Sequence, residues 1–447
     1  MRLKPLSIFE FDEFAKNHPL GSFHQSSSYG MLMSERGYDY ELIGMVDDND
    51  KIVAASLILF KRIGLFSKYG YAPKGFLIDY TNTSLLKEFT TLLKHRYYRK
   101  NFVFIKINPE ISIASLDFKE KQKVFNDAKN IENVLESIGF RKLADNKYFE
   151  TMQPKFNAAL RLKNFDLSRV DKRTRNKIRK SMRKGLSLVK GTREDIDIIY
   201  KLVKNKKNIS RLHYYNYYNV FQKSDSIDIF LVKIDFEKGL IAANQMYEQE
   251  LERNAQLVKI FLNNNNEENL RRKMESDKVL ISIKDDIAYI TSCLSKKDSE
   301  YIAGAITIKF KDRVNILISG FDNRFRRFNP NYFLHYQLIE YYKNNYTYID
   351  MNGITGDFSD DNPYKGLNEF KSGFNPESFE LIGEFDFIIN EGVYKNLDAN
   401  GYLMKEFDRA EANSPTREEV KEVKVVKEVK EVKKENTLKK SFITITK

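Results

Sequence analysis

The sequence contains no tryptophan and a single cysteine, Cys293, among its 447 residues. One cysteine excludes an intramolecular disulfide framework and fits a reducing compartment. The five histidines are scattered, with no H-E-x-x-H motif, so no metal site is expected. Phosphate-binding glycine motifs and the G-x-S-x-G nucleophile turn are also missing. These absences leave Asp, Lys, Tyr and backbone amides for any chemistry, and no cofactor is expected.

Long apolar runs are absent as well. The longest, near Ile52–Phe60, is far too short to span a membrane, and no apolar segment follows the first residues, so no secretory signal is expected. The formal net charge is +13. Such a charge favours polyanionic partners, either nucleic acid or an anionic membrane face. The sequence therefore predicts a cytoplasmic protein with a polyanionic partner.

One order of elements occurs twice along the chain. Two strands forming a hairpin are followed by a helix and a further strand, each recognised by its apolar periodicity. In the first copy a strand-like segment with a Pro/Gly break, Tyr69–Tyr80, stands between the hairpin and the helix. The order hairpin, strand, helix, strand is typical of the acyltransferase fold called GNAT, in which a mixed sheet opens beside a helix N-terminus. We therefore predict a mixed α/β (α+β) fold with two GNAT-like subdomains. The expected elements are Tyr40–Val46, Lys51–Phe60, Ser84–Arg99 and Asn101–Asn108, then Tyr301–Phe310, Arg313–Ser319, Asn331–Asn344 and Tyr346–Met351.

Two further segments complete the predicted organisation. Gly239–Cys293 carries two apolar stripes separated by Asn263–Asn266, which predicts an inserted antiparallel helical hairpin. The Val-Lys-Glu run within 410–447 suits neither a helix stripe nor a strand, and predicts a disordered tail. The first subdomain is expected to cover residues 1–155, and the second residues 156–238 and 294–395.

The segment Asp171–Lys184 is unusually basic and includes Arg175, Lys177 and Arg179. Ile178 and Met182 lie one helical turn apart and are expected to anchor a helix to the core. A solvated basic helix is the simpler interpretation. Because this density of one charge sign is self-repelling, we favour phosphate binding.

A second candidate segment is Tyr346–Pro376. Its apolar strand is expected to stop at the turn dipeptide Asn352-Gly353, before a polar loop and the sequence Phe370-Lys371-Ser372-Gly373-Phe374. A lysine held between aromatic residues can bind an anion, or lose its proton through burial and act as a base. The alternative is an exposed lysine on a connecting segment.

Together these segments resemble the Fem family of peptidoglycan-bridge aminoacyltransferases. The resemblance covers about residues 1–395, and its motifs keep the family's order and spacing. They are Phe23-His24-Gln25-Ser26 with Tyr29, Gly37-Tyr38 through Ile43-Gly44, Tyr71-Ala72-Pro73-Lys74-Gly75 through Asp79-Tyr80, the basic segment Arg173–Gly185, Phe321-Asp322-Asn323-Arg324-Phe325-Arg326, Asn352-Gly353-Ile354-Thr355-Gly356 through Gly366, and Phe370-Lys371-Ser372-Gly373-Phe374.

The resemblance implies transfer of an amino acid from aminoacyl-tRNA to the stem-peptide lysine, or to the growing bridge, of a peptidoglycan precursor. That precursor is lipid II or UDP-MurNAc-pentapeptide. It also implies peripheral contact with the inner membrane face and oligomers with copies of itself or with related transferases. Lys371 would bind phosphate or stabilise the oxyanion, and Asp79 would orient or deprotonate the amine. A turn cap is the alternative for Asp79.

Residues expected to bind substrate follow from the same resemblance. They are Arg175, Arg179 and Lys177 of the basic segment, Lys74, and the loosely matched Tyr214 and Tyr215. Met33 stands where the family has a lysine, which removes one phosphate contact. Lys74-Gly75-Phe76 replaces the family's Arg-Gly-Pro.

Two other functions are compatible with the sequence. One is a coenzyme A-dependent N-acyltransferase of a small amine, although the R-x-x-G-x-G/A loop expected for coenzyme A is missing after Arg313–Ser319. The other is a non-catalytic protein that binds RNA or a membrane surface through its basic helix. In that case Lys371 would be irrelevant to activity.

Overall fold

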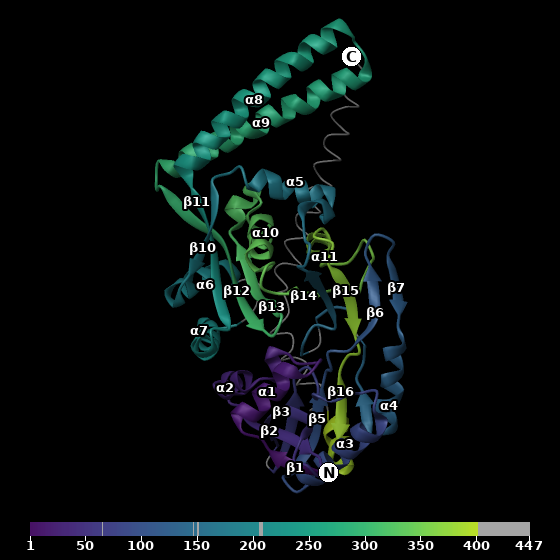
Figure 1. The fold of residues 1–447 in the computed structure, drawn as a ribbon. Helices are drawn as coiled ribbons and strands as arrows, with labels where there is room; N and C mark the ends of the chain where they lie inside the picture. The colour runs from purple at the N-terminus through teal and green to yellow at the C-terminus, as the bar shows by residue number, and fades with distance from the viewer. Residues whose placement is uncertain (65, 146, 150–151, 205–208, 401–447) are drawn as a thin grey trace.

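The computed structural model describes residues 1–64, 66–145, 147–149, 152–204 and 209–400. Within these residues, two mixed sheets lie at the two ends of the body, and a long helical hairpin projects beyond the second (Figure 1). The tail predicted for residues 410–447 lies outside the described residues.

The first sheet has seven strands among the described residues, in the order β1-β2-β3-β4-β5-β16-β8. Strands β4 and β5 pair in parallel, and the other neighbours are antiparallel. The strands are β1 (Arg2–Pro5), β2 (Asp39–Val46), β3 (Ile52–Ile63), β4 (Ser67–Ala72), β5 (Phe102–Ile107), β8 (Phe140–Lys142) and β16 (Phe385–Ile388).

Helices cover this sheet because their apolar residues recur at helical spacing. Helix α1 (Ile8–Asn17) begins with a capping box in which Ser7 and Glu10 satisfy each other's backbone N–H groups. Helix α3 begins at its cap, Asn82, and turns Leu86, Phe89, Leu93 and Tyr97 toward the core. The helices of this unit are α1, α2 (Ser27–Ser34), α3 (Thr83–Tyr98), α4 (Ile131–Ser137) and α12 (Glu391–Ala399).

The second sheet has nine strands in the described part of the chain, in the order β10-β11-β12-β13-β14-β9-β15-β6-β7. Its parallel pair is β13 with β14. The strands are β6 (Ser112–Asp117), β7 (Gln122–Phe125), β9 (Phe156–Arg161), β10 (Leu186–Gly191), β11 (Ile227–Asp235), β12 (Ser299–Phe310), β13 (Arg313–Phe321), β14 (Tyr348–Ile354) and β15 (Glu377–Leu381).

The second unit repeats the order of the first. Two helices precede three antiparallel strands, and a helix leads from the third strand to a parallel fourth. The predicted mixed α/β fold with two GNAT-like units and an inserted helical hairpin is confirmed. The helices of this unit are α5 (Lys172–Ser181), α6 (Ile196–Val203), α7 (Arg211–Phe221), α10 (Pro330–Tyr342) and α11 (Lys365–Ser372).

The two sheets exchange strands across residue 155, where the sequence placed the end of the first subdomain. Strands β6 and β7 come from before that residue but join the second sheet. Strand β16, from near the end of the described chain, pairs with β5 of the first sheet. A buried ion pair between Lys106 Nζ and Asp386 Oδ1, 2.8 Å apart, links these two strands. Each sheet therefore contains strands from both parts of the chain, joined by backbone hydrogen bonds.

The predicted helical hairpin is formed by α8 (Phe236–Asn263) and α9 (Glu267–Leu294), and its break falls at the asparagine run. A polar contact stabilises the pairing, because Asn254 Nδ2 donates to Asp277 Oδ1 at 2.9 Å and to Ser276 Oγ at 3.1 Å. Among the described helices, none combines the length and the apolar character required to span a bilayer.

Two local expectations were wrong. Strand β14 does not stop at Asn352-Gly353 but continues to Ile354, with an irregularity in its pairing to β9 between Asp350 and Gly353. Asn352 takes a left-handed conformation there, with φ of 67°. Lys371, expected in the loop that leaves this strand, lies instead in the last turn of α11.

Candidate active site

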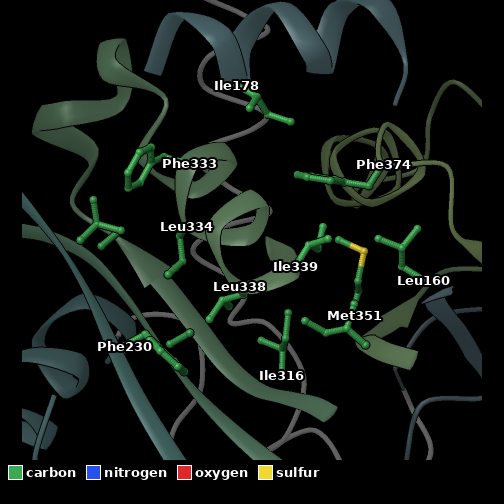
Figure 2. Close-up of a cluster of buried hydrophobic side chains, with 14 of the residues drawn as sticks. Leu160, Ile178, Phe230, Ile316, Phe333, Leu334, Leu338, Ile339, Met351 and Phe374 are labelled. Atoms are coloured by element: carbon green, nitrogen blue, oxygen red, sulfur yellow. The ribbon is translucent and has the colours of Figure 1, made fainter. Parts of the chain in front are cut away.

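The site is organised around the place where β13 and β14 separate. The strands pair in parallel over three residues only, from Arg313 opposite Tyr348 to Asn315 opposite Asp350. Beyond that point β13 follows β12, whereas β14 follows β9. Helix α10 covers the separation, with Leu338 and Ile339 pointing toward Ile316 of β13 and Met351 of β14 (Figure 2). Apolar packing under α10 therefore fixes the place where the two strands separate.

A buried polar network holds the loop that follows β14. The side-chain oxygen of Asn368 in α11 accepts from Thr355 N at 3.0 Å, and its amide donates to Thr355 Oγ1 at 2.9 Å. Asn362 Nδ2 donates to the same hydroxyl at 2.7 Å. All three side chains are buried. Because buried polar groups must be paired, this network fixes α11 against the end of β14.

Lys371 lies in that framework and is only 8% exposed. Its Nζ donates to Gly353 O at 2.5 Å, so the ammonium reaches from α11 to the end of β14. The alternative of an exposed lysine on a connector is therefore wrong. A buried ammonium that is held on a backbone carbonyl can donate to a developing oxyanion at the same place.

The basic segment forms α5, whose N-cap Asp171 accepts from the backbone N–H groups of Arg173 and Thr174. Ile178 is fully buried, as predicted, but Met182 is 48% exposed and anchors nothing. The reason is that α5 ends at Ser181, so Met182 lies beyond its last turn.

The cations of α5 point outward. Arg179 and Lys177 are exposed, and Arg175 is half-buried with its guanidinium donating to Ser168 O at 3.0 Å. Lys177 Nζ donates to the hydroxyl of Tyr332 at 2.8 Å and lies 4.6 Å from the centre of that ring. Such a surface suits phosphate groups.

Helix α5 lies directly beside the segment that carries Lys371. Asp171 N donates to Gly373 O at 2.9 Å. A side chain at Gly373 would place its Cβ 2.1 Å from Thr174 Oγ1, so only glycine permits this approach. Phe370 packs edge-on against Tyr332 of α10, with ring centres 4.9 Å apart. The structure thus brings together Lys371, the basic helix and the start of α10.

Asp79 lies elsewhere, in the first unit ahead of α3. Its carboxylate is exposed and accepts from Thr81 N at 2.9 Å and from Thr81 Oγ1 at 2.6 Å. These hydrogen bonds lower the pKa of Asp79. Among the described residues, no hydrogen bond or ion pair joins Asp79 to Lys371 or α5. Its geometry is that of the turn cap.

Lys74 is buried in the first unit. Its backbone N–H donates to Asn108 Oδ1 at 2.8 Å, and its backbone is left-handed, with φ of 60°. Burial, with the Lys74 ammonium as a smaller cause, lowers the pKa of His24 well below its usual range. Burial raises the pKa of Asp350, and the Lys74 ammonium is the smallest of the causes that oppose this rise. Lys74 therefore lies where the two units meet.

Tyr214 and Tyr215 belong to α7, which packs against α2. Tyr214 is buried in a core shared by both units, and burial raises its pKa to about 12. Tyr215 donates its hydroxyl to Asp197 Oδ1 at 3.0 Å, and the Arg193 guanidinium lies 4.7 Å from its ring centre. The structure does not bring these tyrosines into contact with Lys371.

Asp350 is a candidate that the sequence did not single out. Its carboxylate lies 3.7 Å from Arg313 Nη1, which pairs with Glu110 of the first unit at 2.7 Å. Burial raises the pKa of Asp350. A carboxyl group with a raised pKa suits a general base, and only two residues separate Asp350 from Gly353. The sequence did not mark Asp350, because Arg313 and Glu110, which surround it, come from distant parts of the chain.

The doubled mixed sheet, with a parallel strand pair that separates beneath a helix, defines a double acyltransferase fold. The sequence model of the FemAB family matches residues 6–400, and the chain belongs to this family. It is an aminoacyltransferase, as predicted.

Relatives and solved structures agree with this membership. The Lipid II:glycine glycyltransferase of Staphylococcus epidermidis is 24% identical over 402 residues, which cover 86% of this chain and 92% of that protein. Its counterpart from Staphylococcus aureus is 24% identical over 409 residues, covering 87% and 93%. The crystal structure of FemX shares the fold, with a TM-score of 0.69 and 21% identity over 89% of this chain and all of that one.

Proposed function

We propose that this chain transfers an aminoacyl group from aminoacyl-tRNA to the peptide amine of lipid II or its growing cross-bridge, at the inner face of the cell membrane. Family membership and the relatives named Lipid II:glycine glycyltransferase, aligned over more than nine-tenths of their length, support the acceptor. The observation that carries the proposal is the basic helix α5 beside the buried ammonium of Lys371.

The reaction needs no redox chemistry. The acceptor amine attacks the ester carbonyl carbon of aminoacyl-tRNA, a C–N bond forms, and the C–O bond to the ribose breaks. The proton lost by the amine ends on the ribose oxygen. Because the ester is already activated, positioning and oxyanion stabilisation supply most of the rate.

Each group has a role in this scheme. Arg175, Lys177 and Arg179 of α5 hold phosphates of the tRNA or the diphosphate of the acceptor. The Lys371 ammonium donates to the oxyanion that forms near Gly353. Asp79 is the predicted group for orienting the amine, and Asp350, with its raised pKa, is a second candidate for accepting the amine proton.

A single-turnover assay tests the proposal. Purified lipid II is mixed with the enzyme and a mixed pool of charged tRNAs, and the product mass identifies the amino acid transferred. We expect an acceptor heavier by one or more amino acid residues. A parallel reaction supplies acyl-coenzyme A with small amines. Transfer from coenzyme A alone would overturn the proposal, and no transfer in either reaction would favour a non-catalytic binding protein.

A further inference from the structure

One edge of the first sheet gathers three surface segments. The turn between β3 and β4 lies there, because Ile63 opposite Ser67 is the last pair of those strands. The end of α3 lies beside it, since Lys68 N donates to Asn101 O at 2.9 Å. The segment after β16 reaches the same edge, where Ile389 N donates to Val103 O at 2.9 Å.

A cavity of about 310 Å³ opens at this edge, outside the candidate active site. Helix α3 supplies most of it from the face that turns away from the core. The wall combines three side chains that carry or can carry positive charge with an exposed tyrosine and an apolar residue. The lining residues are Thr91, Lys94, His95, Tyr98, Arg99 and Ile389.

The surroundings are also mainly basic. Six cations belong to the elements that meet here: Arg62 at the end of β3, Lys68 at the start of β4, and Lys94, Arg96, Arg99 and Lys100 in the last two turns of α3 or just after them. The acids are fewer. Glu41 accepts from Arg96 and Lys100 together. Glu391 pairs with Lys395 at 2.7 Å, and its charge also acts on Lys94. Asp39 is an exposed acid at the start of β2. The excess positive charge favours an anionic partner.

Two aromatic side chains stand out from this basic edge. Phe66, in the turn after β3, is 85% exposed, and Tyr98 at the end of α3 is 58% exposed. A single exposed aromatic residue is ordinary. Aromatic rings flanked by cations, however, are the combination that settles at the boundary between lipid headgroups and acyl chains.

We propose that this edge docks on a bilayer of anionic phospholipid, with one phosphate headgroup in the cavity of Lys94 and Arg99 and with Phe66 at the headgroup boundary. The cavity favours a lipid headgroup over an RNA strand because it is a local pocket of about 310 Å³ with Ile389 in its wall, not a basic groove that follows a polynucleotide backbone. The purpose of docking, access to a lipid-linked acceptor, rests on the proposed function, but the binding is measured without any transfer reaction.

The test is co-sedimentation with vesicles of phosphatidylcholine, with or without about 40% phosphatidylglycerol. We expect binding only to the anionic vesicles, and we expect it to weaken as salt rises from about 50 to about 500 mM. Lys94→Glu with Arg99→Glu should lower the partition coefficient about tenfold or more, because two attractions become repulsions. Phe66→Ala should also lower the partition coefficient, but the dependence of binding on salt should stay the same.

The matched control is Arg271→Glu with Lys278→Glu, which makes the same charge change on exposed residues of α9. It should bind vesicles like the unchanged protein, and circular dichroism should show all variants folded. Equal binding to neutral vesicles, or an equal loss in the control, would overturn the proposal. So would a Lys94/Arg99 variant that loses tRNA binding and keeps vesicle binding. Transfer to purified lipid II held in detergent micelles, with no bilayer present, tests the proposed function separately.

Discussion

Lys371 is the single residue on which the proposed chemistry depends most. Replacing it by methionine keeps a buried apolar stem but removes the ammonium that reaches Gly353 O. We expect the single-turnover rate to fall by about 10²–10³, the usual effect of losing one oxyanion donor. Rapid-quench measurement with saturating lipid II checks this prediction.

The same helix provides the control for Lys371. Lys365 is exposed and pairs with Asp360 at 2.8 Å. Lys365→Met therefore makes the same substitution on the same helix, but at a solvent-exposed ammonium. Its rate should stay within about twofold, because exposed ion pairs contribute little. A Lys371→Met enzyme as fast as the Lys365→Met enzyme would remove Lys371 from the chemistry.

Glu384 carries a pH dependence of stability. It is buried between β15 and β16, and burial raises its pKa from 4.5 to about 6. From about pH 4.5 to about pH 6 the folded state keeps a proton that the unfolded state has lost, so stability falls as pH rises through this window. Above it, the folded state bears the full cost of the buried charge.

Glu384→Gln removes that cost, because glutamine does not ionise. At about pH 7.5 we expect the free energy of unfolding to rise by up to about 2 kcal/mol, and at about pH 4.5 we expect little change. Urea unfolding at the two pH values measures both. A gain of equal size at each pH would show that packing, not the proton, is responsible.

Sequence patterns predicted some of these residues but not others. Lys371 was singled out because aromatic residues flank it in the sequence, and the structure shows that its side chain is buried. Asp350 and Glu384 did not, because the burial of an acid depends on partners distant in the chain. For Asp350 the partner is Arg313, which arrives from the adjacent strand.

At the scale of elements, α5 is the part of the molecule whose binding role can be isolated. Arg175→Ala with Arg179→Ala removes two outward cations and leaves the buried Ile178 in place. We expect weaker tRNA binding, and a plot of log affinity against log salt that is shallower by about 1.5, because each phosphate contact releases counterions. Filter binding of labelled tRNA at several salt concentrations measures the slope.

A matched variant separates local contacts from overall charge. Lys16→Ala with Lys51→Ala removes two exposed cations from the first unit, far along the chain from α5. The affinity of this variant should fall slightly and its slope should stay the same. Equal slopes in both double variants would mean that tRNA responds to net charge alone.

Most elements were predictable because each is determined by its own periodicity and end signals. The hairpin of α8 and α9 ends where its stripes and the asparagine run place it. The end of β14 was not predictable, because Asn352-Gly353 is an ordinary turn signal. Here pairing with β9 continues past it, and Asn352 takes the left-handed conformation inside the strand.

At the scale of the whole molecule, the exchange of strands between the sheets could not be predicted. Lys106 and Asp386 are 280 residues apart in sequence, yet they face each other across β5 and β16. Each of these strands has the pattern of an ordinary buried strand, and nothing local identifies its partner. One consequence is that the first sheet is incomplete until nearly all of the described chain has been made.

That exchange predicts how the molecule unfolds. Lys106→Met leaves Asp386 buried without its cation, and should lower the free energy of unfolding by about 3–5 kcal/mol. Adding Asp386→Asn removes the uncompensated charge and keeps an acceptor for the Tyr394 hydroxyl, which donates to Asp386 Oδ2 at 2.9 Å, so much of the loss should be recovered.

Because the sheets share strands, circular dichroism and tyrosine fluorescence should report one urea transition that shifts as a whole. Two separate transitions, of which Lys106→Met moves only one, would show that each unit folds independently despite the exchanged strands.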